Sequence, residues 1–270
     1  MSFLSNTLDK LNSTLGAPIF KNTNTLNNNF FNYLYKKNII INEMDEDIRK
    51  FHTDGYLKTN VNSTNLCDYL SKQIEMQNPK RDETRRIFFK MNDEMKKKIK
   101  DHIFSDFKQI LDKFEKYYNN KIAIVGTFVK RNYFVEDEKY YDQTIRDKSK
   151  EYFNMYFHCD AYTLNYFKLF ISISDIDETK GPLNFYPIKS NKSFIKKAKY
   201  KNRLHYENVE TDGLIKNISK KGESIFISTP QCMHKAGMPD YGKYRDVLCV
   251  ILAATFENIN SYSRAICGDK

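Results

Sequence analysis

The sequence lacks several features that would assign it to a protein class at once. It contains no tryptophan and only five cysteines, which are widely spaced and form no C-x-x-C pair: Cys67, Cys159, Cys232, Cys249 and Cys267. An odd number of isolated cysteines excludes a disulfide framework and a thiolate zinc site. The absence of tryptophan, together with 35 lysines against 9 arginines and with 27 asparagines, is typical of an AT-rich genome.

Long apolar runs are also missing. The longest, Val247 to Phe256, is interrupted only by Thr255 and has the length of a strand, so no membrane span is expected. The first ten residues have neither a basic start nor a continuous apolar stretch, so we expect no secretory signal and a cytoplasmic location. Apolar residues nevertheless make up 40 % of the 270 residues, with 20 Phe and 19 Tyr, which excludes a disordered chain.

The charge is moderately basic, because 44 Lys and Arg face 34 Asp and Glu and give a net charge of +10. One lysine run, Lys96 to Lys98 with Lys100, resembles a nucleic-acid patch, but it falls on the polar side of an amphipathic helix pattern, where a solvated face explains it. The chain shows no RNA-binding signature of aromatic and basic residues and no DNA-reading motif. No nucleic-acid partner is therefore expected.

The first part of the chain is predicted to be an arm followed by helices. Residues 1–45, rich in Asn, Thr and Ser, predict a loosely structured N-terminal arm, and residues 46–270 a single domain. Apolar residues at three- and four-residue steps predict a mostly helical flank over 46–120, with helices at about 45–54, 63–77 and 92–118. Gly55 ends the first helix, and Tyr56-Leu57 begins a short strand.

After residue 120, runs of β-branched and aromatic residues alternate with turn residues. They predict an all-β core over 121–258, a sandwich or a barrel, with six strands: Ile122–Val129, Tyr152–His158, Tyr166–Ser174, Leu183–Tyr186, Ser224–Ser228 and Asp246–Phe256. The stretch at 188–221 is rich in Lys and Asn and is too long for a hairpin turn. We expect it to be an insertion or a lid.

Histidine is scarce, and one of the five histidines stands in an informative context. His158 and Asp160 form an H-x-D pair at the end of a predicted strand. Residues i and i+2 of a strand point to the same side, so the two side chains can converge on one cation. A third ligand, His234, would complete the two-histidine, one-carboxylate face that binds Fe(II) and leaves positions open.

The H-x-D pattern alone is weakly specific, because His52-Thr53-Asp54 is a second copy. This copy lies at the break before Gly55, where Asp54 has a turn to form, so we assign it a structural role. Cys159 lies between two predicted ligands and points away from them by the same alternation, which favours packing over metal binding.

Arg245 strengthens the interpretation of His158. It follows His234 by eleven residues and begins the last apolar strand. A buried arginine that faces a metal cavity needs an anion, and its planar guanidinium suits a carboxylate.

Four blocks of the chain, in order, resemble the phytanoyl-CoA dioxygenase-like family of Fe(II)/2-oxoglutarate-dependent oxygenases. They cover roughly residues 45 to 258 and comprise Asp47 to Leu57, His158-Cys159-Asp160, Phe170 to Leu183, and Gly222 to Phe226 with His234 and Arg245. Two positions depart from the family pattern. Pro187 to Asn191 stands where the family commonly has P-G-S-H, and Ala236 where a serine is common.

The resemblance implies a double-stranded β-helix, or cupin-like jelly roll, that is mainly β with flanking helices. It implies Fe(II) held by His158, Asp160 and His234, 2-oxoglutarate bound by Arg245 beside Phe170 and Ser172, and O2 as oxidant. Because Asp160 is retained, the expected reaction is hydroxylation of an unactivated C–H bond.

The remaining candidates concern the substrate. Lys130 and Asn132 at the end of the first β run, Tyr156 on the next strand, and Lys189 in a lysine-rich cluster that extends to Arg203 are the candidate substrate contacts. The cluster suggests a small, anionic metabolite, because clustered positive charge steers anions. Two alternatives remain open: a metal-binding jelly roll with non-oxidative chemistry, such as an isomerase or hydrolase, and a basic interaction module without catalysis.

Overall fold

The computed structural model of the chain describes residues 45–78, 86–134, 157–160, 164–191 and 212–255. Nearly all of the expected arm at 1–45 therefore lies outside the described residues. The same holds for Tyr156, for residues 152–156 of one predicted strand, and for residues 192–211 of the expected insertion.

Two antiparallel sheets form the β core. The larger has six strands in the order β1-β7-β4-β9-β3-β2, and the smaller has three in the order β6-β5-β8. The strands of the larger sheet are β1 (Tyr56–Thr59), β2 (Arg86–Phe88), β3 (Lys121–Tyr133), β4 (Tyr166–Ser172), β7 (Ser224–Ile227) and β9 (Tyr244–Thr255). Those of the smaller sheet are β5 (Leu183–Phe185), β6 (Ile215–Asn217) and β8 (His234–Ala236).

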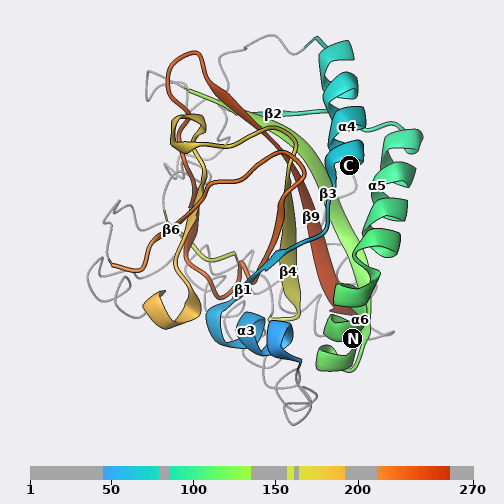
Figure 1. Ribbon diagram of the computed structural model, residues 1–270, viewed down its shortest axis with the longest axis vertical. Coiled ribbons are helices and arrows are strands. Elements are labelled where there is room, and N and C mark those ends of the chain that lie inside the picture. The colour runs from blue at the N-terminus through green and yellow to red at the C-terminus, as the bar shows by residue number, and fades with distance from the viewer. Residues whose placement is uncertain (1–44, 79–85, 135–156, 161–163, 192–211, 256–270) are drawn as a thin grey trace, which may run out of the picture.

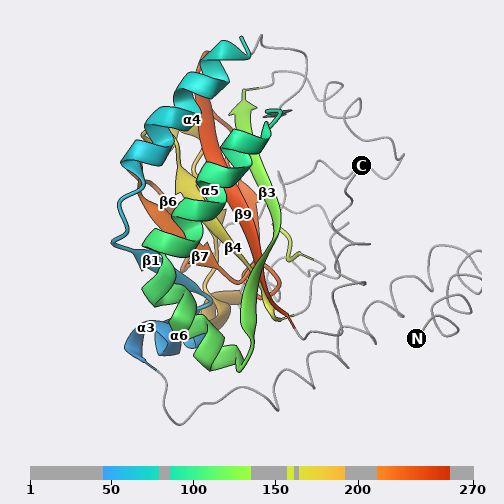
Figure 2. The same ribbon diagram turned by 90° about the vertical axis from the view of Figure 1, so that its right-hand side faces the viewer.

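Helices cover the outer face of the larger sheet, on the side away from β6 (Figures 1 and 2). They are α4 (Thr64–Met76), α5 (Asp93–Asp106) and α6 (Lys108–Tyr118), while α3 (Glu46–Asp54) lies near one end of the sheet. The predicted fold class, mainly β with flanking helices around a jelly-roll core, is confirmed. Among the described residues, no helix has the length and apolar character needed to cross a membrane.

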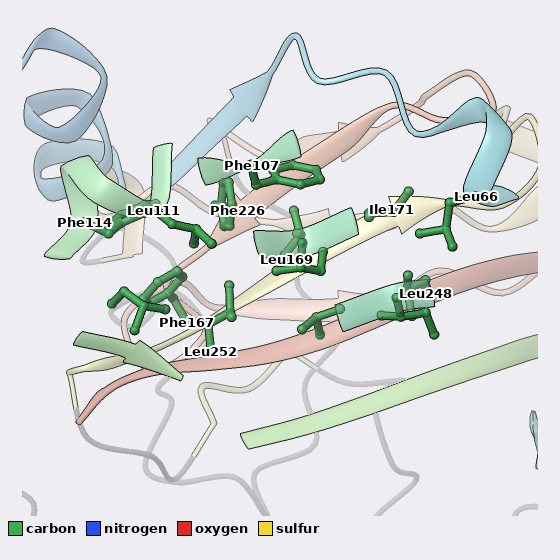
Figure 3. Close-up of a cluster of buried hydrophobic side chains, with 14 of the residues drawn as sticks. Leu66, Phe107, Leu111, Phe114, Phe167, Leu169, Ile171, Phe226, Leu248 and Leu252 are labelled. Carbon is green, nitrogen blue, oxygen red and sulfur yellow. The ribbon is translucent and has the colours of Figure 1, made fainter. Parts of the chain in front are cut away.

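Alternation along the central strands separates the two faces of the larger sheet. Phe167, Leu169 and Ile171 of β4 point toward the helices and lie in the main core with Phe226 of β7 and Leu248 of β9 (Figure 3). Residues in between, such as Lys168, Phe170 and Ser172, face the inside of the jelly roll and line a cavity there. The helical side thus provides the apolar core, and the inner side is available for a site.

The structure corrects the prediction of one helix over 92–118. The chain forms two helices, α5 and α6, which meet at Phe107, where φ is −91° and ψ is 6°. The break turns the Phe107 ring into the core, where it lies edge-on to Phe226 with ring centroids 5.8 Å apart. The amides of Ile110 and Leu111 both donate to the carbonyl of Phe107. Apolar residues keep their four-residue step across the break, from Ile103 through Phe107 to Leu111, so the sequence pattern does not reveal it.

Gly55 ends α3 as predicted and is required there by its backbone. Its φ is +81°, and a Cβ at this position would lie 2.4 Å from the Sγ of Cys232. The amide of Gly55 donates to the carbonyl of Phe51 and completes the helix terminus.

The strand predictions are confirmed for the five runs that fall on β3, β4, β5, β7 and β9, and for β1. Of the run at 152–158 only its end is described, where His158 forms an isolated bridge with His234. Three strands were not predicted: β2, β6 and β8, each of three residues. β5 is as short, but it belongs to the mainly apolar run Leu183–Tyr186, whereas each of the other three contains a basic residue that interrupts such a run.

Candidate metal centre

Backbone pairing brings the three predicted ligands together. The amide of His158 donates to the carbonyl of His234 at 3.0 Å, and the amide of His234 donates back at 2.9 Å. This reciprocal bridge sets the two imidazoles side by side, with ring centroids 4.5 Å apart. Two residues further on, the amide of Asp160 donates to the carbonyl of Thr229 at 3.0 Å. The three side chains are therefore fixed by the main chain of two segments.

The ligand atoms are close enough for one ion. His158, Asp160 and His234 each offer an atom within 4.8 Å of the others. Nε2 of His158 lies 3.9 Å from Oδ1 of Asp160, and Nε2 of His234 lies 3.8 Å from Oδ2. Atoms that each bind one ion at about 2.1 Å are separated by at most about 4.2 Å, so both distances allow a shared metal.

The protonation state of the site also suits a metal. Nδ1 of His234 lies 2.9 Å from the carbonyl oxygen of Cys232, so this nitrogen carries the proton and Nε2 keeps its lone pair for a metal. Burial raises the pKa of Asp160, but the charge of Lys168, its hydrogen bond to the carboxylate and the neighbouring imidazoles of His234 and His158 outweigh it and hold the pKa well below its usual range. Asp160 is therefore ionised, as a metal ligand must be.

A cavity on the inner face of the larger sheet opens beside these ligands. Its described lining combines apolar residues with cations and amides: Lys130, Asn132, Lys168, Phe170, Ser172, Ile176, Leu183, Asn217, His234, Ala236, Arg245 and Val247. Two lysines and an arginine are among them, and no carboxylate is among the described lining residues. This balance of charge suits an anionic ligand.

Most predicted contacts for co-substrate and substrate lie in this cavity. Arg245 is only 4 % exposed, is the register partner of Asn132, and donates from Nη1 to the carbonyl of Gly181. The ammonium of Lys130 lies 5.8 Å from the centre of the Phe170 ring. The hydroxyl of Ser172 is hydrogen-bonded to that of Ser219 at 2.6 Å.

Lys189 is an exception, because the structure does not bring it to the cavity. After Pro187 the chain makes a helical turn in which the amides of Ser190 and Asn191 both donate to the Pro187 carbonyl. This turn directs the Lys189 ammonium outward to Oδ1 of Asp54, at 3.2 Å, and leaves the side chain 68 % exposed. Lys189 therefore does not line the described cavity, and its contact with a substrate stays a prediction.

The second H-x-D pair has the structural role that the sequence suggested. Nδ1 of His52 lies 2.5 Å from the hydroxyl of Tyr117, and Asp54 pairs with Lys50 and Lys189. Cys159 also points away from the ligands, with Sγ 3.3 Å from Sδ of Met233. Burial, followed by the nearby Asp160 charge, raises the pKa of the Cys159 thiol to about 12, so the thiol stays protonated at neutral pH.

Sequence reasoning missed Lys168. The signal was present, because Lys168 interrupts an apolar strand at the position that alternation places on the same face as Phe170 and Ser172. Its ammonium lies 2.5 Å from Oδ2 of Asp160.

No family model matches the chain, and no curated protein matches it. Similarity is found among solved structures. A crystal structure of HygX from Streptomyces hygroscopicus with nickel and 2-oxoglutarate bound gives a TM-score of 0.52 at 14 % identity, covering 79 % of this chain and 88 % of that one. HygX with iron bound gives 0.50 at 12 % identity over the same shares.

A structure of EctD from S. alaskensis with 2-oxoglutarate and 5-hydroxyectoine gives 0.49 at 12 % identity, over 80 % of each chain. At these identities the similarity concerns the fold. The chain thus shares the fold of HygX.

Proposed function

We propose that the protein is a non-haem Fe(II)/2-oxoglutarate-dependent oxygenase that hydroxylates an unactivated C–H bond of a small anionic metabolite. The observation that carries the proposal is the buried triangle of His158, Asp160 and His234 beside a cavity that contains Arg245. The fold shared with HygX, of which one structure holds nickel and 2-oxoglutarate and another holds iron, supports it. The motif resemblance to the phytanoyl-CoA dioxygenase-like family supports it as well.

The donor set fits Fe(II). Two neutral imidazoles and one ionised carboxylate on one face of an ion leave the remaining positions open for other ligands. When bound, Fe(II) with 2-oxoglutarate and O2 supplies an oxidant strong enough to hydroxylate a C–H bond, with release of succinate and CO2. The protein's part is to hold these groups in order and to keep water away from them.

Arg245 and Lys130 provide the anion-binding end of the cavity. Arg245 is buried and presents a guanidinium suited to two-point contact with a carboxylate. Lys130 enters the same cavity from the neighbouring strand β3. Phe170, Leu183 and Val247 give the walls an apolar surface, which limits water around the bound groups.

The anionic character of the substrate is supported by the same lining. Asp160 compensates Lys168, but Lys130, Arg245 and a bound Fe(II) would together carry four positive charges against the two negative charges of 2-oxoglutarate. A substrate with a carboxylate or phosphate would balance the remaining positive charge.

The experiment that tests this proposal is an anaerobic titration of the protein with Fe(II) and 2-oxoglutarate, followed by admission of O2. The complex of Fe(II) with 2-oxoglutarate in the protein should give a weak visible charge-transfer band, and succinate should appear when O2 is admitted. His158→Ala should lose the band. His52→Gln, which alters the second H-x-D pair, should keep it and is the matched control.

The results separate the alternatives. An absent band in the wild type that is indistinguishable from His158→Ala would refute the iron centre. Metal binding that 2-oxoglutarate does not alter would indicate non-oxidative chemistry instead.

A further inference from the structure

Lys168 lies at an unusual position for a lysine. Its strand, β4, runs between β7 and β9 inside the larger sheet, and its register partners there are Ile227 and Ile251. The side chain is only 15 % exposed. An ammonium held among apolar neighbours in a sheet is costly unless a negative group compensates it.

The compensating group is the carboxylate that belongs to the metal centre. Nζ of Lys168 lies 2.5 Å from Oδ2 of Asp160, whose side chain is 7 % exposed. A charge-assisted hydrogen bond of this length between two buried side chains is strong and fixes the orientation of both.

The contact matters for the way in which Asp160 presents its oxygens. A carboxylate has two oxygens and about four lone-pair directions, so it can bind a metal through one atom or through two. Oδ2 accepts from Lys168 and lies 3.8 Å from Nε2 of His234, whereas Oδ1 lies 3.9 Å from Nε2 of His158. The hydrogen bond from Lys168 occupies part of the lone-pair capacity of Oδ2, so Oδ1 is the better oxygen for a one-atom bond to the metal, which leaves more positions open.

We propose that Lys168 is a positioning residue of the metal centre, which holds Asp160 as a one-atom ligand by binding its other oxygen. The inference rests on the proposed metal site at His158, Asp160 and His234. Partners that orient metal ligands contribute measurably to affinity, and their loss typically weakens metal binding roughly 10–100-fold.

A second effect of Lys168 has the opposite sign, which makes the proposal testable. An ammonium beside a divalent ion repels it, so a lysine that acted only through its charge would weaken metal binding. Removing a positioning lysine lowers the affinity, whereas removing a merely repelling one raises it.

The test is Lys168→Met, which keeps the length of the side chain and removes the donor and the charge. Co(II) is titrated under anaerobic conditions without 2-oxoglutarate, and its visible absorption is recorded. We expect roughly 10–100-fold weaker binding and a changed Co(II) spectrum, because Asp160 is then free to bind through both oxygens. Lys58→Met, which removes an exposed lysine from strand β1 of the same sheet, should leave the Co(II) affinity unchanged.

Two further variants establish that Lys168 acts through Asp160. Lys168→Arg retains a cationic donor and should restore most of the affinity. In an Asp160→Ala background, adding Lys168→Met should not weaken the residual affinity further. If Lys168→Met does not fold, Lys168→Leu, which also lacks a donor, takes its place with the same expected weakening.

Unchanged or tighter Co(II) binding by a folded Lys168 variant would overturn the inference. A wild-type protein that binds no Co(II) or Fe(II) would instead refute the proposed metal site, so the two failures are distinguishable.

Discussion

Arg245 is the side chain on which the choice of co-substrate depends. It is buried, its neighbour in register is the uncharged Asn132, and it donates a hydrogen bond to the main-chain carbonyl of Gly181. The guanidinium lines the cavity, where its planar arrangement of N–H donors suits a carboxylate.

Arg245→Gln tests this role. Hydrogen bonds to charged groups are worth about 1.5–3 kcal/mol, so the affinity for 2-oxoglutarate should fall by roughly one to two orders of magnitude. Anaerobic titration of 2-oxoglutarate into the Fe(II)-loaded protein, followed by the charge-transfer band, measures it. The affinity for Fe(II) alone should not change. Equal 2-oxoglutarate affinity in the variant and the wild type would show that Arg245 binds something else.

At the residue scale, spacing and alternation in the sequence predicted which side chains share a face. His158 and Asp160 share a side because they are two apart on an extended chain, and the structure brings them beside His234. Lys189 points to Asp54 and not into the cavity, because of a turn after Pro187 that leaves no pattern in the sequence. Lys168 was overlooked, because a lone lysine in an apolar strand gains meaning only from the carboxylate that it faces.

The end of β3 is joined to the start of β9 by a buried ion pair. Nε and Nη2 of Arg131 each donate to one oxygen of Asp246 at 2.7 Å, and the guanidinium lies 3.8 Å above the ring of Tyr244. The pair is adjacent in sequence to Asn132 and Arg245, so it fixes the part of the two strands that presents them to the cavity. Burial raises the pKa of Asp246 even though Arg131 lowers it, so the pair is costly to desolvate.

Asp246→Asn should destabilise the protein, because the buried Arg131 loses its counter-charge. Breaking a buried pair on one side typically costs about 3–5 kcal/mol. Urea unfolding followed by circular dichroism measures the difference. Asp112→Asn, which breaks the exposed pair with Lys108 on α6, is the control and should change the free energy of unfolding by less than about 1 kcal/mol. Similar losses in both variants would contradict the structural role of the buried pair.

At the scale of elements, a continuous run or a regular spacing of apolar residues decided what could be predicted. Helices and strands with several periods of apolar spacing were found, including α4, β4 and β9. The break between α5 and α6 was missed, because Phe107 keeps the apolar period while the backbone departs from the helix. The smaller sheet consists of three-residue strands whose pairing depends on contacts distant in sequence, which local propensity does not encode.

The molecule as a whole is held together at the candidate site by residues far apart in the chain. His158 and Asp160 come from one segment and His234 from another. Main-chain hydrogen bonds and the packing of Phe157 and Cys159 with Met233 join the two segments, and a bound metal would add a further link. A ligand that binds only the folded state stabilises it by about 2.7 kcal/mol at a free concentration of 100 times its Kd.

Adding Co(II) should therefore raise the melting temperature by several degrees, given about 2–4 °C per kcal/mol for a chain of this size. Differential scanning fluorimetry with and without Co(II) measures the rise, and EDTA should reverse it. His158→Ala should lose the rise, while His52→Gln should retain it. A rise of the same size in His158→Ala would mean that the stabilising ion binds elsewhere.

The position of β9 in the larger sheet has a consequence for the synthesis of the protein. This strand is the last of the described strands along the chain, yet it lies between β4 and β3 and pairs with both. Roughly 110 residues separate the end of β3 from the start of β9, and translation at about 5–20 residues per second takes about 5–20 s to cover them. During that time β3 and β4 have left the ribosome without the strand that joins them. The sheet therefore closes only after nearly the whole domain has been made, and the nascent chain exposes unpaired strand edges on which chaperones would act.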